Sequence, residues 1–245
     1  MTDFLSHIDS RRFGFNIARV DDVSLLLTKG FITSLREKDI RLVITRTGIE
    51  NLASVNLLAD RGFRIMDIQS VWRSTHRHCP DNPDELKDLS IGFATAADVP
   101  AFREIAAGSF EGYGHYFADP RLNRTRCREI YPDWAATTLT DPDVADKVIA
   151  ARVNDKTAGF LSLKIHKNNG DCYVAGVIGA VANEFRGKNI FKTILHHALV
   201  WQQENQLSWT QHNVLTSNIP VNRALASCGF RPAAACVTLH GWIDQ

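Results

Sequence analysis

The sequence predicts an α/β protein with a mixed, mostly antiparallel sheet flanked by helices, preceded by a smaller and partial α/β unit. Three observations predict this. Apolar residues recur at strand and helix periods along the 245 residues. Three strand candidates in the region 147–181 are joined by turns rich in Asn, Asp and Gly, as in an antiparallel meander. A helix-turn-strand signature occurs twice, as "NLLADRGFRI" at 56–65 and "NRALASCGFR" at 222–231.

The repeated signature is the most specific of these observations. Each copy has a helical pattern that ends at a glycine, Gly62 or Gly229, followed by Phe-Arg at the start of a strand. Aligned on Gly-Phe-Arg, the two regions share the pairs Asn51/Asn218, Leu58/Leu225, Ala59/Ala226, Gly62/Gly229, Phe63/Phe230 and Arg64/Arg231.

The first part of the chain reads strand, helix, strand, helix, strand. We expect a strand at 13–20, one helix at 25–38, a strand at 40–46, a helix at 51–62 and a strand at 63–72. The segment "HCPDNPDELKD" (78–88) then interrupts the pattern with two prolines and several acids. It predicts an N-terminal domain at 1–80, a linker at 81–88 and a second domain at 89–245.

The second part opens with a short strand and a helix capped by Thr95, with Asp98 in its first turn. A helical stretch at 123–135 precedes the meander. The longest helix is expected at 188–206, a strand at 208–216, and a helix from Asn218 to Gly229. A bent strand or a hairpin closes the sequence.

Composition excludes several functional classes. A net charge of +1 gives no basic field for nucleic acid. The sequence has no run of 18 apolar residues, so we expect no membrane-spanning helix. The beginning "MTDFLSHIDS" is unlike a secretory signal. The cysteines, Cys79, Cys127, Cys172, Cys228 and Cys236, are five in number and form no CxxC pair, so we expect reduced thiols, a cytoplasmic protein and no metal site.

The segment "VIGAVANEFRGKNIFKTIL" (177–195) carries the strongest chemical signal. An apolar strand enters a polar turn with Arg186, Gly187 and Lys188, and a helix follows directly. Backbone N–H groups at a helix start are unpaired and the helix dipole attracts anions there. We therefore expect a cradle for a diphosphate.

Residues 89–245 resemble the GNAT fold of acyl-CoA-dependent N-acyltransferases. The family's turn, Gln/Arg-x-x-Gly-x-Gly/Ala, aligns with "RGKNIF", and its later Asn and helix ending in Gly-Phe align with Asn218 through Phe230. The first 80 residues resemble an incomplete second copy. With "FGFNIARV", "GYGHYFADPRL" and "EIYPDWA", nearly the whole chain resembles the dTDP-fucosamine acetyltransferase group, which acylates nucleotide-linked amino sugars for surface polysaccharides.

The resemblance implies an acyl-CoA co-substrate, most simply acetyl-CoA, and a nucleotide sugar as acceptor. It assigns cofactor contacts to the strand, turn and helix start, namely Ile178, Gly179, Ala180, Val181, Arg186, Gly187, Lys188, Asn189, Ile190 and Phe191, and to Asn218. It assigns acceptor contacts to His115, Tyr116, Asp119 and Arg121. No nucleic-acid or membrane partner is expected, and a homodimer is a candidate assembly.

Four positions depart from the family pattern. Asn189 and Phe191 replace small residues; Asn tolerates positive φ, and Phe191 is expected to point into the core. Leu225 stands where many members have a Tyr that acts as the general acid, and Asn213 stands where peptide acetyltransferases have a Glu that acts as the base.

In the family, the strand before the turn splays from the later strand and leaves a slot for the cofactor, here between 178–181 and 210–216. Asn213, on one face with Gln211 and Leu215, is expected to face this slot and to hold a water, whereas His212 alternates away. His240 is the candidate proton acceptor near the amine.

Two alternatives stay open from the sequence. One is a GNAT acetyltransferase of a protein N-terminus or a small amine, which Asn213 and Leu225 disfavour in its peptide form. The other is a non-catalytic module that senses acyl-CoA, which Phe191 and the missing Tyr favour.

Overall fold

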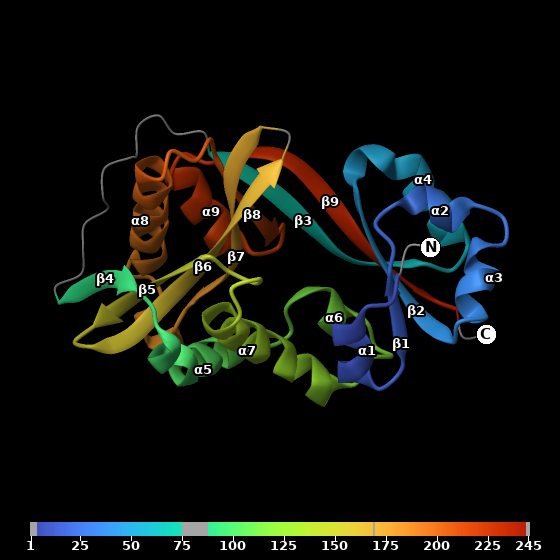
Figure 1. The fold of residues 1–245 in the computed structure, drawn as a ribbon, viewed down its shortest axis with the longest axis horizontal. Helices are drawn as coiled ribbons and strands as arrows, with labels where there is room; N and C mark the ends of the chain where they lie inside the picture. The colour runs from blue at the N-terminus through green and yellow to red at the C-terminus, as the bar shows by residue number, and fades with distance from the viewer. Residues whose placement is uncertain (1–3, 75–87, 169, 244–245) are drawn as a thin grey trace. The chain divides into compact units, whose positions relative to one another are not determined.

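A computed structural model describes residues 4–74, 88–168 and 170–243, and these form two compact units (Figure 1). Unit 1 contains the chain up to Ser70, 112–127 and the stretch from Ala234; unit 2 contains 71–111 and 128–233. Both units are therefore assembled from separated stretches. Cys79 and residues 81–87 of the expected linker lie outside the described residues, and the expected domain boundaries stay a prediction.

Unit 1 is an α/β unit built mainly from the N-terminal stretch. Its elements are α1 (His7–Phe13), β1 (Asn16–Arg19), α2 (Val23–Leu27), α3 (Phe31–Arg36), β2 (Ile40–Gly48), α4 (Leu52–Asp60), the first part of β3 (Arg64–Ser74), α6 (Gly114–Ala118) and the end of β9 (Arg231–Trp242). Its strands lie in the order β1-β2-β9-β3. Strands β1 and β2 are parallel, whereas β2 and β9 are antiparallel.

The two faces of the unit 1 sheet differ in character. Val43, Val237 and Leu239 face the helices α2, α3 and α4 and belong to one buried apolar cluster with their side chains. Because side chains alternate along a strand, His240 points to the opposite face. There it meets His115 of the short helix α6. One face is thus an apolar core, and the other holds buried polar groups.

Unit 2 contains the meander that the sequence predicts. Its elements are β4 (Leu89–Phe93), α5 (Val99–Ser109), most of α7 (Arg124–Thr140), β5 (Lys147–Val153), β6 (Lys156–Asn168), β7 (Asp171–Val181), α8 (Ile190–Glu204), β8 (Thr210–Leu215), α9 (Ile219–Ser227) and the end of β3. The order is β3-β8-β7-β6-β5-β4. Strands β4 to β7 pair in antiparallel fashion, and β7 and β8 are parallel.

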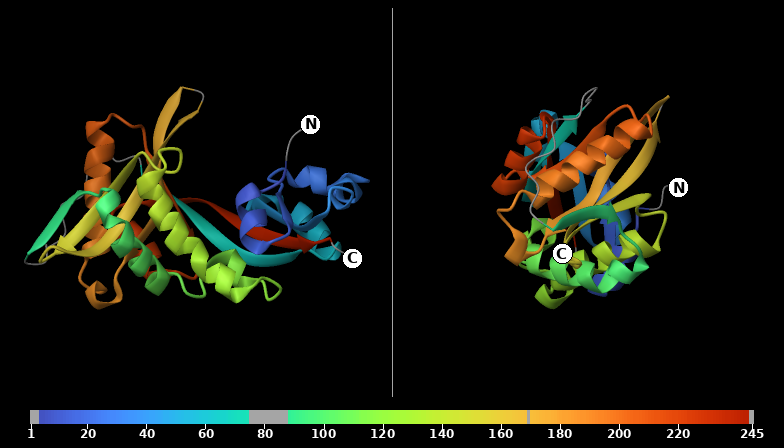
Figure 2. Two further views of the ribbon diagram at one scale, coloured as in Figure 1. Left: turned by 60° about the horizontal axis from the view of Figure 1, so that its bottom comes forward. Right: turned by 90° about the vertical axis from the view of Figure 1, so that its left-hand side faces the viewer.

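Helices cover both faces of the unit 2 sheet (Figure 2). Leu161 and Leu163 of β6 point toward α8 and share its apolar cluster. Phe160, one position earlier, points to the other face and stacks on Phe102 of α5, with ring centroids 4.1 Å apart. Alternation along one strand therefore gives the sheet two buried faces.

The repeated helix-turn-strand signature is confirmed by matching backbone bonds. The Phe63 N–H donates to the Leu58 carbonyl, and the Phe230 N–H donates to the Leu225 carbonyl, both at 3.0 Å. The intervening glycines have φ of 89° at Gly62 and 79° at Gly229, as a left-handed helix end requires. Both helices end in the same way before β3 and β9.

Several elements differ from the sequence prediction. The single helix expected at 25–38 is two helices, because Gly30 has a φ of 82° between them. Helices α1 and α6 were not predicted, since they have seven and five residues and show no helical period. The segment after Gly229 is one strand, β9. No helix in the described ranges is both long and apolar enough to cross a membrane.

The left-handed glycine after α4 gives a test of the repeated helix end. A Cβ at Gly62 would contact nothing within 4 Å, so Gly62→Ala has only the backbone cost of a φ near 89°. We expect a loss of about 1 kcal/mol in the free energy of unfolding. Gly92→Ala is the control, because its Cβ is equally unobstructed and its φ is ordinary. Equal stability of the two variants in urea denaturation would contradict this account.

Candidate functional site

Two neighbouring strands of unit 2 separate soon after they begin to pair. Strands β7 and β8 pair only at Val174↔Thr210 and Ala175↔Gln211. On its other side β7 stays paired with β6 as far as Val181. From Gly176 onward, the side of β7 toward β8 therefore has no strand partner among the described residues. This divergence is the slot that the sequence predicts between the two strands.

A β-bulge lies in β7 where the slot begins. Leu161 pairs with Gly179 and Leu163 with Gly176, so β7 has one residue more than β6 in this interval. A bulge turns the local backbone away from a regular ladder and re-aims its polar groups. Gly179 has no room for a side chain, since a Cβ would lie 2.9 Å from the Leu161 side chain. Ile178 and Ala180 on either side are buried.

The turn between β7 and α8 exposes a series of backbone donors. Gly187 and Asn189 have φ of 78° and 58°, and Asn189 is the N-cap of α8. The first donor inside the helix is the Thr193 N–H, which bonds the Asn189 carbonyl at 3.0 Å. No backbone carbonyl of a described residue accepts from the N–H groups of 187–192. Such a turn at a helix N-terminus fits a phosphate or diphosphate.

Two cations and an aromatic ring frame this turn. The Arg186 guanidinium donates to the Val181 carbonyl at 3.2 Å and to the Ser109 hydroxyl at 3.0 Å. The Lys188 ammonium lies 5.3 Å from the centre of the Phe185 ring. Both cations are exposed. Their charge adds to the positive end of the helix dipole.

The two departures from small residues in this turn are accommodated. Asn189 adopts the left-handed conformation that the sequence analysis expects. The Phe191 ring packs against the apolar cluster beneath α8, and a Cβ at Gly179 would lie 3.3 Å from that ring. Phe191 therefore points into the core, as predicted, and away from the exposed N–H groups. Ile190 is fully buried in the same cluster.

Strand β8 presents opposite chemistry on its two faces. Gln211 and Asn213 share one face, where the Gln211 Nε2 donates to the Asn213 Oδ1 at 3.1 Å. His212 points the other way, is 5% exposed, and packs against Phe230. Burial lowers the pKa of His212 from 6.5 to about 4. The alternation expected along this strand is confirmed for these three residues.

The helix after β8 starts at a capped asparagine. The Asn218 Oδ1 accepts from the Val221 N–H at 3.4 Å, so Asn218 is the predicted N-cap. A contact of Asn218 with a pantetheine arm stays a prediction. Leu225, farther along α9, is fully buried in the core. Its position supplies no proton donor.

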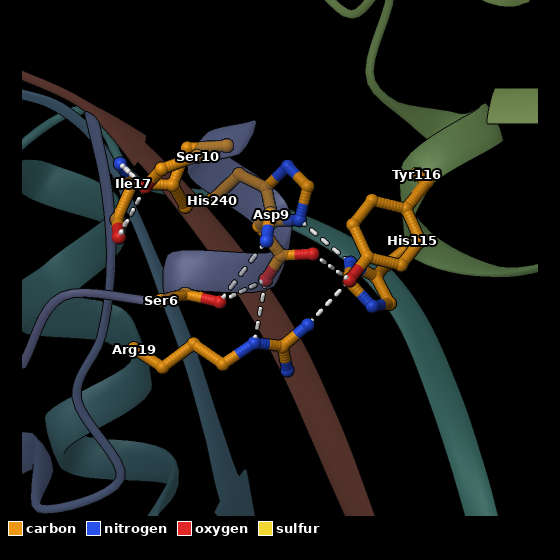
Figure 3. A network of polar contacts seen from close by, with 8 residues as sticks. All are labelled: Ser6, Asp9, Ser10, Ile17, Arg19, His115, Tyr116 and His240. Atoms are coloured by element: carbon orange, nitrogen blue, oxygen red, sulfur yellow. Dashed lines mark hydrogen bonds and ion pairs between the residues drawn. The ribbon is translucent and has the colours of Figure 1, made fainter. Parts of the chain in front are cut away.

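The structure brings His240 and the four predicted acceptor residues together in unit 1. Figure 3 shows three of these five residues, His240, His115 and Tyr116. His240 Nδ1 lies 2.7 Å from Asp119 Oδ2, and His240 Nε2 lies 2.8 Å from His115 Nδ1. The Trp242 indole N–H donates to the same Asp119 oxygen at 2.9 Å. The Arg121 guanidinium lies 3.8 Å above the Trp242 ring. His240, Asp119 and His115 are all buried.

Tyr116 belongs to an adjoining network that the sequence analysis missed. The Tyr116 hydroxyl donates to Asp9 Oδ1 at 2.7 Å, and Arg19 bonds both that hydroxyl and Asp9 Oδ2 (Figure 3). Asp9 lies in α1, three residues after the N-cap Ser6. The Ser-x-x-Asp spacing is a capping signal that the sequence offered. It indicates a helix start, but not the partners of Asp9.

The titration of this cluster follows from its contacts. Burial raises the pKa of Asp119, but hydrogen bonds from His240, Arg121 and Trp242 outweigh it, and the pKa lies below the usual value. Burial and the neighbouring His240 hold the pKa of His115 well below 6.5. An ionised Asp119 accepts from the Nδ1–H of His240. The direction of the hydrogen bond between His240 Nε2 and His115 Nδ1 depends on the tautomer of the two rings. The functional roles expected for these residues stay predictions.

The fold is that of known N-acetyltransferases. It resembles a GCN5-related N-acetyltransferase from Sphaerobacter thermophilus, at 15% identity and a TM-score of 0.60, over 88% of this chain and 65% of that one. It also resembles a tandem GNAT protein from the clavulanic acid biosynthesis pathway, at 16% identity and a TM-score of 0.60, over 93% of this chain and 75% of that one. A third structure is a glucosamine N-acetyltransferase region of a fungal GH3 β-N-acetylglucosaminidase, at 13% and 0.60, over 88% and 27%.

These likenesses establish the GNAT fold, with a partial GNAT-like unit before the main one. No protein-family model matches the sequence, and a search of curated proteins found no match. The chain spans just under two thirds of the Sphaerobacter protein and about a quarter of the fungal one.

Burial of His212 predicts an acid-sensitive fold. Because the folded-state pKa of His212 is depressed, the unfolded chain binds the proton more tightly. The contribution of the neutral His212 to the free energy of unfolding is therefore fully present above pH 6.5 and is lost as the pH drops toward 4. Between pH 7.5 and 5, the wild type should lose about 2 kcal/mol more than His212→Gln. Urea denaturation at both values measures this difference. Identical losses in the two proteins would show that His212 is not the titrating group.

Proposed function

We propose that this protein is an acyl-CoA-dependent N-acyltransferase. The observation that carries the proposal is the divergence of β7 from β8 next to a turn whose N–H groups at 187–192 have no backbone acceptor among the described residues. An extended chain with a diphosphate at one end matches both features. The pantetheine arm and diphosphate of coenzyme A have this form.

The residues of the strand and turn divide the binding between them. In the proposal, the unpaired side of β7 at Ile178–Val181 bonds the pantetheine arm as an added strand would. The N–H groups of Gly187 to Phe191 bond the diphosphate, with Arg186 and Lys188 supplying charge. Asn218 adds a contact to the arm. Acetyl-CoA is the simplest donor, and a longer acyl group is equally compatible with these contacts.

The reaction is direct attack of a neutral amine on the thioester carbonyl in a ternary complex. The new C–N bond forms, the C–S bond breaks, and the thiolate takes a proton to leave as coenzyme A. Backbone N–H groups stabilise the charge that develops on the carbonyl oxygen. Holding the two reactants together can supply about 7–11 kcal/mol of the barrier. A thiolate leaves without a strong acid, which is consistent with a buried Leu225.

We further propose a dTDP-linked deoxyamino sugar as the acceptor, within cytoplasmic synthesis of surface polysaccharide. Support comes from the resemblance of 112–122 and 129–135 to that group and from the fungal structure described as a glucosamine N-acetyltransferase region. His115, Tyr116, Asp119 and Arg121 are the proposed acceptor residues, and His240 is the proposed proton acceptor. A homodimer belongs to the same proposal.

A sensor of acyl-CoA is the second candidate. It is favoured by the fully buried Leu225 and by an amide, Asn213, where related enzymes have a titratable side chain. A sensor binds acyl-CoA through the same turn but releases no thiol with any amine.

An acceptor panel separates these candidates. We expect thiol release from acetyl-CoA with dTDP-linked amino sugars and much less with peptides or polyamines, because in this proposal the acceptor residues bind a nucleotide sugar. The measurement is free thiol over time, with mass spectrometry of the product. Release with a peptide or polyamine alone would overturn the substrate, and binding of acetyl-CoA without any release would favour the sensor.

Arg186→Ala tests the turn itself. Loss of a cation beside the proposed diphosphate site should weaken coenzyme A binding several-fold, measured by calorimetry. Because Arg186 is exposed, the free energy of unfolding should change by less than about 0.5 kcal/mol. Arg103→Ala is the control, since Arg103 is an exposed arginine paired with Asp133. An unchanged affinity in Arg186→Ala would place the diphosphate elsewhere.

A further inference from the structure

A chain of side-chain hydrogen bonds runs from β3 to β8 in unit 2 and ends two residues past the last β7–β8 pair. The Arg73 Nε on β3 donates to the Gln211 Oε1 at 3.0 Å, and the Gln211 Nε2 donates to the Asn213 Oδ1 at 3.1 Å. Arg73 and Asn213 are exposed, and Gln211 is half-buried. The three residues thus form a short relay that ends on an amide.

The polarity of this relay is set at its arginine end. A guanidinium only donates, so the Gln211 group that meets Arg73 must be its oxygen. The nitrogen of Gln211 is then the atom that meets Asn213, and it needs an oxygen there. Asn213 therefore presents its Nδ2 hydrogens, and not its oxygen, away from the relay.

An aromatic stack holds the arginine in place. The Arg73 guanidinium carbon lies 4.5 Å from the centre of the Trp209 ring. Trp209 in turn stacks on Tyr173 of β7, with centroids 3.8 Å apart and planes 5° from parallel. Cation–π attraction at such a distance favours one position of an otherwise mobile side chain. The start of the relay is therefore fixed by β7 and by the segment before β8.

The end of the relay lies at the slot. The last pair between β7 and β8 is Ala175↔Gln211, so Asn213 is two residues past the point where the strands separate. Its side chain shares the face of Gln211. An oxygen that approaches the opening of the slot from this face meets a fixed N–H donor.

We propose that Asn213 is a specificity residue that donates a hydrogen bond to an oxygen of the acceptor beside its reacting amine, and that Gln211 and Arg73 are positioning residues that fix its polarity. This rests on the acyltransferase proposed above. It stands beside the expectation that Asn213 holds a water, and it uses the Nδ2 hydrogens because Gln211 already donates to the amide oxygen. The acceptor class is an amine with a neighbouring hydroxyl, as in an amino sugar.

Gln211→Glu reverses the polarity with little change in shape. A carboxylate still accepts from Arg73, but it also accepts from Asn213, whose amide then turns its oxygen outward. Asn213→Asp removes the donor directly. Gln206→Glu is the control, because it adds the same charge at an exposed glutamine after α8, outside the relay.

The experiment compares two acceptors, the 3-O-methyl ether of dTDP-4-amino-4,6-dideoxygalactose and the 3-deoxy sugar, which lacks the oxygen beside the amine. An ether oxygen only accepts, so it cannot bond the amide or carboxylate oxygen that the variants turn outward. Calorimetric binding and thiol release with acetyl-CoA are measured separately. The wild type and Gln206→Glu should bind the ether about tenfold more tightly than the 3-deoxy sugar. In Gln211→Glu and Asn213→Asp this ratio should fall to about one or below, and any charge repulsion of the diphosphate cancels in the ratio.

The outcomes separate the two proposals. A preserved ratio in Gln211→Glu overturns the positioning role, and a wild-type ratio near one, or no binding of either sugar, overturns the hydrogen bond from Asn213. A tenfold ratio that collapses in both variants supports the inference even if no thiol is released. In that case it is the acyltransferase that fails.

Discussion

The early separation of two parallel strands is the constraint on which the rest of unit 2 depends. Backbone donors and acceptors need partners, and among the described residues β7 beyond Ala175 has a paired strand on one side only. The separation begins where His212 meets Gly176, since a Cβ at Gly176 would lie 2.1 Å from the His212 ring. The bulge, the crowded Gly179 and the open turn before α8 all follow within a few residues. A ligand with an extended polar chain and an anionic end satisfies all of these groups together.

The first copy of the repeated unit lacks this arrangement. Strand β1 pairs with β2 at all four of its residues, and two short helices stand where the second copy has α8. The copies share their helix ends and the strands that follow, and each of these strands finishes in the other unit: β3 ends in unit 2 and β9 in unit 1. Unit 1 therefore gains an antiparallel neighbour for β2, and unit 2 gains a neighbouring strand for β8. The partial copy thus contributes structure without a second slot.

Local signals made most of the fold predictable. Hydrophobic periodicity predicted the meander and α8. Glycine and asparagine residues, which tolerate positive φ, predicted the helix ends and the turn before α8. The polar cluster of unit 1 was only partly predictable. Its members come from α1, β1, α6 and β9, so no local pattern relates Asp9 to Tyr116 or His240 to Asp119. The orientation of the Asn213 amide could not be predicted either, because it depends on Arg73 of β3, which is far away in the sequence. Contacts between strands and helices that are far apart in the sequence produce no periodic pattern from which they could be predicted.

The buried cluster around His240 depends on the hydrogen bonds that Asp119 accepts. A buried carboxylate is costly unless hydrogen bonds satisfy it, and Asp119 receives them from His240, Trp242 and the Arg121 backbone. These bonds join the end of β9 to the segment around α6 within unit 1. The same Asp119 favours the Nδ1–H tautomer of His240, whose Nε2 lies against His115. Removal of the carboxylate therefore disturbs both the packing of this cluster and the His240 tautomer. An amide at position 119 keeps one accepting oxygen but turns the other into a donor, so either the Arg121 N–H or the pair of His240 and Trp242 loses its acceptor.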